Sequence, residues 1–430
     1  MIKRPSRRDI VKATVRLTAI GALGLRDTAT ARATAPTKPE PGTFSQIDSM
    51  LRAATRAGEI PGVVALAATD HGIAYEGIFG KRRLGDEPAM TRDTVFRVAS
   101  MVKLITSVAA LQLVEQNKLS LDAPVPDIEP AIGAPQVLDG FDAKGLPQLR
   151  PAQRPITLHH LLTHTSGFAY RLWDAKAVHY ARLIEQLPKA QRKLAPPTPL
   201  MFDPGAGWQY GTSIDWVGRI VEAISGEPLD VYFRKHILDP LGMNDTAFVL
   251  NPQQRQREAS VHRRAPNGAL TAEPLEQNSP RQSFSGGGGI YSTAPDYLTL
   301  IRALLAGGAL DGARILRPET VALMGRNQIG DIDVGVLKTT VPALSNDVDL
   351  CPGVTRKWGF GHMITMQGMT GGRGAGSLTW GGLLNTYYWI DPARKIAAVF
   401  MTQVLPFADS QALRLYRQFE HGVYAAVKAG

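Results

Sequence analysis

Apolar positions recur along the chain at two spacings, one typical of helices and one typical of strands. Residues 44–58 carry apolar side chains three or four positions apart, which predicts a helix. Residues 61–69 and 73–79 are two apolar runs separated by a short polar turn, and they predict an antiparallel pair of strands. The first part of the chain therefore combines a helix with paired strands.

The middle of the chain reads mainly as helices, and its end returns to strands. Helical spacing predicts helices at residues 100–119, 156–163, 177–187, 213–224, 297–306 and 409–426. Apolar runs predict strands at residues 377–380, 385–390 and 396–404. Residues 123–154 are rich in Pro, Gly and Asp without a regular period, which predicts an extended loop.

Strands at both ends around a helical middle predict an α+β fold. We expect an antiparallel sheet built from both chain ends, flanked by helices as an α/β sandwich, with a mostly helical insertion. The sheet domain would comprise residues 44–124 and 357–430, and the insertion residues 125–356. Residues 36–43 contain three prolines and are typical of a linker.

Composition fits a globular protein and excludes several other classes. Of 430 residues, 44% are hydrophobic and 20% are charged, and Gly has no fixed period. Collagen, coiled coils and disordered chains have different compositions. The single cysteine, Cys351, excludes an internal disulfide and a cysteine-based metal site.

The formal net charge of +10 suggests nucleic acid or an acidic membrane as a partner, but its position changes that interpretation. Residues 1–33 carry eight Lys and Arg against two Asp, so six of the ten charges lie there. The rest of the chain is only mildly basic, and we expect no nucleic-acid partner.

That basic segment is typical of an export signal. Arg7 and Arg8 precede a moderately apolar stretch and then the small residues 29–35, which predicts a twin-arginine signal peptide over residues 1–35. The protein would then be periplasmic or secreted. A disordered basic tail is the alternative. No apolar run reaches the ~18 residues that a bilayer requires, so we expect no stable membrane span.

Ser100 and Lys103 form the sharpest chemical motif. They lie three positions apart at the start of a predicted apolar helix, so both side chains share one face. A serine hydroxyl becomes a strong nucleophile when a base removes its proton, and a lysine can serve if burial lowers its pKa. The first turn of a helix also offers free N–H groups to an oxyanion. A helix-capping Ser100 with an exposed Lys103 is the structural alternative.

Five segments in order carry a resemblance to a known family. They are VFRVASMVK at residues 95–103, ITLHHLLTHTSG at 156–167, FDPG leading to YGT at 202–212, GGGGIYSTA at 286–294, and WGG at 380–382. From about residue 44 onward the chain resembles the serine β-lactamase and penicillin-binding-protein superfamily, and within it the class C β-lactamase-like esterases, the family VIII carboxylesterases. The resemblance implies a β-lactamase/transpeptidase-like fold with the active site between sheet domain and insertion.

The resemblance also implies roles for individual residues. Ser100 would be the nucleophile, Lys103 its partner in proton transfer, and Tyr210 the general base or the acid that protonates the leaving oxygen. Which of Lys103 and Tyr210 takes the first proton stays open. The backbone N–H groups of Ser100 and Leu383 would form the oxyanion hole.

Substrate preference is implied by two departures from the β-lactamase pattern. Trp380, Gly381 and Gly382 stand where β-lactamases usually have Lys-Thr-Gly, and Thr212 stands where they usually have Asn. These four residues would bind substrate, with the glycines allowing it to approach the strand closely. Loss of the lysine disfavours anionic β-lactams and favours neutral, hydrophobic esters.

Two other features suggest cofactors and are better explained by structure. His160 and His164 have a metal-ligand spacing but no evident third ligand, so we expect no metal. The glycines at residues 286–289 lack the Lys-Ser/Thr of a phosphate-binding loop, and we interpret them as a close-packed turn near the cleft. No organic cofactor is implied.

The sequence therefore predicts a serine carboxylesterase that acts on a small-molecule ester through an acyl-Ser100 intermediate. Transfer of the acyl group to an alcohol would compete with hydrolysis where the cleft excludes water. One alternative is a β-lactamase or D-amino-acid peptidase that acts on cell-wall-like amides. A second alternative is a ligand-binding member of the fold without catalysis.

Overall fold

The computed structural model describes residues 44–85, 88–188, 198–275 and 283–429. The predicted signal peptide and linker, residues 1–43, lie outside the described residues. Within the described ranges, no helix combines the length and the hydrophobicity that a bilayer crossing requires.

A seven-stranded antiparallel sheet forms the centre of the fold, in the strand order β11-β12-β13-β14-β15-β1-β2. Its strands are β1 (Gly62–Thr69), β2 (Gly72–Gly80), β11 (Arg356–Trp358), β12 (Met363–Thr365), β13 (Leu378–Gly382), β14 (Thr386–Asp391) and β15 (Ile396–Met401). The first two strands pair with the last five because β1 lies beside β15, where Leu66 pairs with Val399. The predicted α+β fold, with a sheet built from both chain ends, is confirmed.

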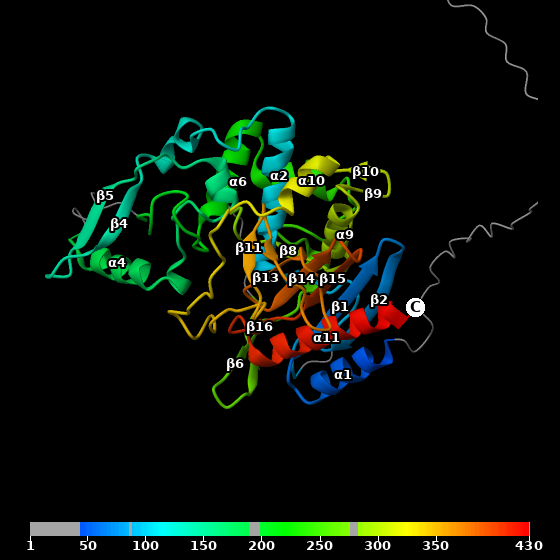
Figure 1. Ribbon diagram of the computed structural model, residues 1–430. Coiled ribbons are helices and arrows are strands. Elements are labelled where there is room, and N and C mark those ends of the chain that lie inside the picture. The colour runs from blue at the N-terminus through cyan, green and yellow to red at the C-terminus, as the bar shows by residue number, and fades with distance from the viewer. Residues whose placement is uncertain (1–43, 86–87, 189–197, 276–282, 430) are drawn as a thin grey trace, which may run out of the picture. The chain divides into compact units, whose positions relative to one another are not determined.

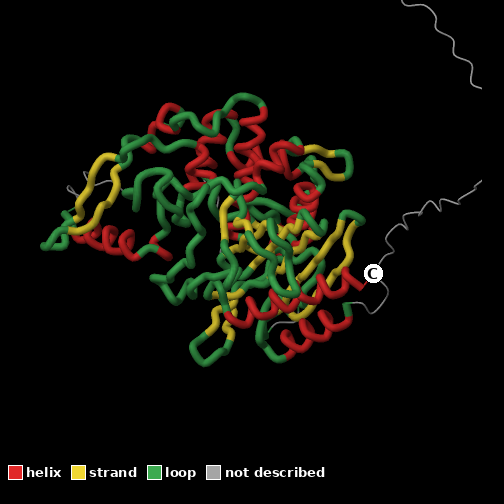
Figure 2. The backbone as a smooth tube through the Cα atoms, viewed as in Figure 1, coloured by secondary structure: helices red, strands yellow, loops and turns green. Residues whose placement is uncertain are grey.

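Helices cover both faces of this sheet (Figures 1 and 2). On one face lie α1 (Ser45–Arg56) and α11 (Ser410–Ala429), and on the other lies α9 (Ala294–Leu305). All six residues of β14 are buried, because its alternating side chains enter both interfaces. Trp389 contacts Phe419 of α11, with ring centroids 5.4 Å apart, whereas its neighbour Tyr388 contacts Tyr297 of α9. Its four central residues, Tyr387–Ile390, are aromatic or aliphatic, as expected for a strand covered on both faces.

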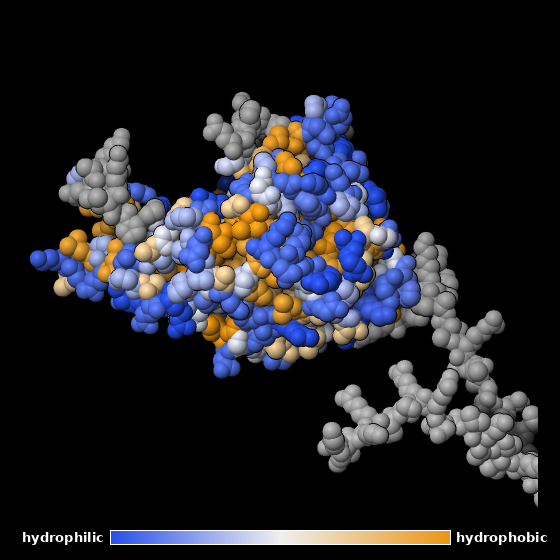
Figure 3. Space-filling view, turned by 90° about the horizontal axis from the view of Figure 1, so that it is seen from above, coloured by the Kyte–Doolittle hydropathy of each residue, from blue (hydrophilic) through white to orange (hydrophobic). Residues whose placement is uncertain are grey.

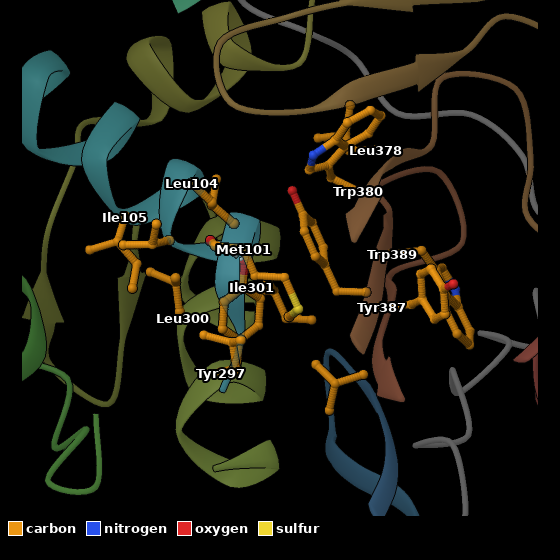
Figure 4. Packing of buried hydrophobic residues seen from close by; sticks show 14 of the residues in the cluster. Met101, Leu104, Ile105, Tyr297, Leu300, Ile301, Leu378, Trp380, Tyr387 and Trp389 are labelled. Atoms are coloured by element: carbon orange, nitrogen blue, oxygen red, sulfur yellow. Dashed lines mark hydrogen bonds between the residues drawn. The ribbon is translucent and has the colours of Figure 1, made fainter. Parts of the chain in front are cut away.

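The helix after the Ser-Lys motif is a central part of the core. A short 3-10 turn, η1 (Ala99–Met101), leads into α2 (Val102–Glu115), which is buried from its first residue to Leu113. Figure 4 shows Met101, Leu104 and Ile105 beside residues of α9, and the backbone oxygen of Met101 accepts the Tyr297 hydroxyl at 2.9 Å. The predicted helix 100–119 ends early, since Asn117 has a φ of 57°.

The segment predicted as an insertion, residues 125–356, contains short helices and contributes to small sheets. Besides α9, its described helices include α3 (Leu158–Leu162), α4 (Ala175–Gln186), α6 (Ser213–Ser225), α7 (Leu229–Phe233) with its π-helical extension η5 (Arg234–Leu238), α8 (Pro252–Gln256) and α10 (Pro318–Met324). Its small strands pair with one another or with strands outside the segment: β8 (Tyr291–Ser292) with β3 (Phe96–Arg97), β6 (His262–Arg264) with β7 (Leu270–Ala272) and β16 (Val404–Leu405), and β9 (Ala309–Leu310) with β10 (Ala313–Arg314). The exact domain boundaries stay a prediction.

The loop predicted at residues 123–154 is wrong in part, because it contains a hairpin. Strands β4 (Gln136–Phe141) and β5 (Pro147–Pro151) pair antiparallel and lie away from the central sheet in Figure 1. The Asp142 carboxylate accepts the N–H groups of Lys144 and Leu146, each at 2.8 Å, and so closes the turn. Proline at the strand ends concealed the strand pattern.

Hydrophilic and hydrophobic residues are interspersed over the face shown in Figure 3. The large apolar side chains are mostly inside, where one extensive cluster joins the sheet to the helices on both faces. Burial of this apolar surface is the main favourable contribution to folding.

Leu415→Ala tests the packing of α11 on the sheet. Leu415 is fully buried, so its truncation should lower the free energy of unfolding by about 2–5 kcal/mol in denaturant titrations. Gln418→Ala on the exposed face of the same helix is the control and should change it by less than about 0.5 kcal/mol. Equal effects of the two substitutions would contradict this packing.

Candidate active site

Ser100 lies in a turn whose backbone is held in an unusual conformation. The preceding residue, Ala99, has a φ of 44°, in the left-handed region that non-glycine residues rarely adopt. The N–H of Val98 donates to the oxygen of Ile290 at 3.2 Å, which ties the turn to the next segment. Ser100 faces a cavity of about 530 Å³.

Lys103 is buried and donates all of its hydrogen bonds within the protein. Its side chain is 1% exposed. The ammonium nitrogen donates to Ser100 Oγ at 3.2 Å, to Tyr170 OH at 3.2 Å and to the Gly287 oxygen at 2.6 Å. An ammonium has three donors, so this set satisfies it completely. The alternative with an exposed lysine is excluded by this burial, and Ser100 does not cap the helix.

The electrostatics of Lys103 favour its charged form. Burial acts to lower the pKa of Lys103, but the oxygens of Tyr170, Tyr210 and Asp215 outweigh it and raise this pKa above its ordinary value. From the sequence we expected that Lys103 could act as a base only if burial lowered its pKa. The structure gives the opposite direction, so Lys103 holds its proton in this state.

Tyr210 is buried beside Lys103 and receives a hydrogen bond from Trp380. The indole Nε1–H of Trp380 donates to Tyr210 OH at 3.1 Å, and the Lys103 nitrogen lies 5.1 Å from the centre of the Tyr210 ring. Gly211 lets this segment approach its neighbour, since a Cβ there would lie 2.1 Å from the Phe168 oxygen. Packing therefore requires glycine at position 211.

Aromatic rings surround Tyr210 on several sides. Trp380 packs against it with ring centroids 4.9 Å apart, and Trp358 packs edge-on against Trp380 at 4.7 Å. His164 lies 4.8 Å from the Tyr210 ring, and burial holds the pKa of His164 well below its ordinary value. These packed rings hold the Tyr210 phenol in place, and none of them adds a positive charge to that of Lys103.

Gly382 brings the end of β13 against the Ser100 turn. A Cβ at Gly382 would lie 2.3 Å from the Val98 oxygen, and one at Gly381 would lie 2.7 Å from the Tyr387 ring. Both glycines therefore have a packing reason. Leu383 follows directly and lines the same cavity as Ser100.

The predicted site residues fall into two groups. Ser100, Thr212 and Leu383 line the cavity. Trp380 and the two following glycines are buried in β13, outside the cavity wall, and Trp380 reaches the site through its hydrogen bond to Tyr210. Lys103 and Tyr210 lie between the two groups, since Lys103 donates to Ser100 and lies over the Tyr210 ring, and Tyr210 accepts from Trp380.

Sequence reasoning missed three residues at this site. Tyr170 and Gly287 accept hydrogen bonds from Lys103, and Asp215 accepts the Tyr170 hydroxyl at 3.2 Å. Asp215 is the acidic residue in the first turn of the apolar helix α6, directly after the tyrosine segment, and this position was a usable signal. Tyr170 offered none, because it only follows a recognised segment.

The cavity wall is mainly apolar. The helix α4 and the turn before it contribute Leu172, Trp173, Ala177, Tyr180 and Ala181, and Arg171 is a cation at the same wall. Within the described ranges, no group of three His, Cys, Asp or Glu side chains is arranged to hold a metal ion.

Comparison with known proteins decides the family. Residues 47–422 match the family model described as Beta-lactamase. The chain belongs to the β-lactamase family. It is 33% identical to the ML-236A carboxylate methylbutanoyltransferase of Penicillium citrinum, over 90% of this chain and 96% of that protein. It is 32% identical to the lovastatin esterase of Penicillium rubens, over 89% and 99%.

A solved structure gives the same result. A mutant of simvastatin synthase from Aspergillus terreus superimposes with a TM-score of 0.79 at 30% identity, covering 90% of this chain and all of that one. The family and its esterase branch, which the ordered segments predicted, are confirmed.

Gly382→Ala tests the contact between β13 and the Ser100 turn. The added Cβ would displace Val98 and so move Ser100, and a displacement of about 1 Å is expected to lower kcat for p-nitrophenyl butyrate about 100-fold. Gly335→Ala, where a Cβ meets nothing within 4 Å, is the control and should keep wild-type kcat. Wild-type kcat in Gly382→Ala would rule out this role of the contact.

Proposed function

We propose that this protein is a serine hydrolase that cleaves neutral, apolar carboxylic esters through an acyl-Ser100 intermediate and also transfers the acyl group to alcohols. The observation that carries the proposal is the Lys103 ammonium, which is buried and donates to Ser100 Oγ at the wall of an apolar cavity. The esterase and acyltransferase names of the relatives support it.

Tyr210 is the general base in this proposal. Lys103 donates all three of its hydrogens and holds its proton, so it cannot accept one from Ser100. In the reactive form Tyr210 is a phenolate, whose negative charge is stabilised by the Trp380 indole N–H and by the nearby ammonium. Trp380 thus supplies a neutral donor where β-lactamases usually carry a lysine.

Acylation then follows a balanced sequence of bond changes. Ser100 Oγ attacks the ester carbonyl carbon while its proton passes to Tyr210. The carbonyl electron pair moves onto oxygen, where the N–H groups of Ser100 and Leu383 bind it. Collapse of this intermediate breaks the bond to the alcohol oxygen, and Tyr210 gives its proton to the departing alcohol.

Water or a second alcohol completes the reaction. It attacks the acyl carbon and gives its proton to Tyr210, and Ser100 leaves with that proton. Hydrolysis and acyl transfer differ only in this second nucleophile, so the apolar cavity wall decides the ratio by excluding water. We place this site between the sheet domain, residues 44–124 and 357–430, and the insertion, residues 125–356. Thr212 lies at the cavity wall and would contact the substrate.

Ser100→Ala tests the nucleophile. Hydrolysis of p-nitrophenyl acetate and butyrate by this variant should fall by at least about 1,000-fold, because no acyl-enzyme can form. Ser120→Ala changes an exposed serine outside the cavity wall and should leave activity unchanged. Undiminished ester hydrolysis by Ser100→Ala would overturn the proposal, and nitrocefin turnover more efficient than that of simple esters would favour the β-lactamase alternative.

We also propose export through a twin-arginine signal in residues 1–35, supported by Arg7, Arg8 and the concentration of positive charge there. Replacing both arginines by lysine keeps the charge but removes the paired-arginine signal. In a bacterial host with a twin-arginine pathway, esterase activity should move from the periplasmic to the cytoplasmic fraction. An unchanged distribution between the fractions would contradict export by this route.

A further inference from the structure

The Asp215 carboxylate is connected by hydrogen bonds to two of the three groups that accept from Lys103, namely Tyr170 and Gly287. Asp215 Oδ2 accepts the Tyr170 hydroxyl at 3.2 Å, and Tyr170 in turn accepts from Lys103. On its other side Asp215 Oδ1 accepts the hydroxyl of Ser285. These contacts give Asp215 two separate connections to one ammonium.

The second connection runs through the glycine-rich turn. Ser285 Oγ accepts the N–H of Gly287 at 3.0 Å, and the Gly287 oxygen accepts from Lys103 at 2.6 Å. The turn packs directly on the carboxylate, since a Cβ at Gly287 would lie 2.6 Å from Asp215 Oδ2. Thr106 of α2 binds the Gly286 oxygen at 2.7 Å, so α2 and α6 clamp the turn from two sides.

We propose that Asp215 is a positioning residue, which holds the Lys103 ammonium beside Ser100 through Tyr170 on one side and through Ser285 and Gly287 on the other. This inference rests on the proposed function, because it assumes that Lys103 assists Ser100. Asp215 acts through these neighbours and is not itself a catalytic residue.

Charge balance supports the same role. A buried ammonium without a compensating anion is strongly disfavoured, and among the described residues no carboxylate lies within 4.0 Å of the Lys103 nitrogen. Asp215 compensates at longer range, and together with the oxygens of Tyr170 and Tyr210 it raises the pKa of Lys103 against the effect of burial. Tyr170 transmits the contact as a neutral phenol, because burial raises its pKa and keeps its proton in place.

Two other titratable groups face Lys103. Burial keeps His164 uncharged at neutral pH, and the centre of the Tyr210 ring lies 5.1 Å from the Lys103 nitrogen. Replacing Asp215 by asparagine removes a negative charge that raises the pKa of Lys103, so this pKa should fall. A lower pKa means that Lys103 loses its proton at a lower pH. The fall of activity in the alkaline range should therefore begin at a lower pH than in the wild type.

Asp215→Asn is the direct test, measured as kcat and KM for p-nitrophenyl butyrate across pH. We expect kcat to fall roughly 10- to 100-fold with little change in KM, and the alkaline limb of the kcat profile to move to lower pH. Asp311→Asn is the matched control, because this exposed aspartate has a φ of 48° that asparagine tolerates. It should leave both readouts at wild-type values.

Tyr170→Phe and Ser285→Ala each remove one connection, and they test the inference even if Asp215→Asn folds poorly. Each should lower kcat less than Asp215→Asn, and adding Tyr170→Phe to Asp215→Asn should have a smaller effect than it has alone. A wild-type kcat and alkaline limb in Asp215→Asn would overturn the inference. So would a raised KM with an unmoved alkaline limb, which indicates a purely structural role. Activity in Ser100→Ala would instead contradict the proposed function itself.

Discussion

The structure depends on one buried positive charge. Lys103 is removed from water on a helix that is itself buried, and it keeps its proton because three oxygens accept its hydrogens. Charges are costly to bury unless they are fully hydrogen-bonded and compensated. Several chain segments must therefore bring an oxygen to the ammonium. Among them are Tyr170, directly before η4 (Arg171–Trp173), and Gly287 in the glycine-rich turn.

The fold meets these requirements by close backbone contacts. Gly382 sets β13 against the Ser100 turn, and Gly211 sets the tyrosine segment against its neighbour. The sheet is rigid because both faces are covered, so these approaches are fixed before any substrate binds. The Trp380 indole N–H is a neutral donor to Tyr210, and the Lys103 ammonium is the positive group on the other side of that ring. Preorganised donors of this kind favour charge that develops during the reaction.

Much of this arrangement was predictable from sequence, because its signals are local. Apolar spacing located most helices and five of the seven strands of the central sheet, but not β11 and β12. The Ser100-Lys103 spacing with four ordered segments indicated the family. The hairpin β4-β5 was missed because prolines disguised its pattern. The partners of Lys103 were missed for a different reason: Tyr170, Asp215 and Gly287 lie far apart in sequence, and only the tertiary fold brings them together. The direction of the Lys103 pKa shift depends on those partners, so burial alone gave the wrong sign.

In the proposed function, Ser100 beside this ammonium is the residue that carries the acyl group. Reaction of the wild-type protein with a fluorophosphonate, followed by peptide mapping while esterase activity is recorded in parallel, tests it most directly. We expect one phosphonyl group per chain, on the peptide that contains Ser100, with activity lost in proportion to labelling. Loss of activity with the label on another residue, or full activity with Ser100 labelled, would contradict it.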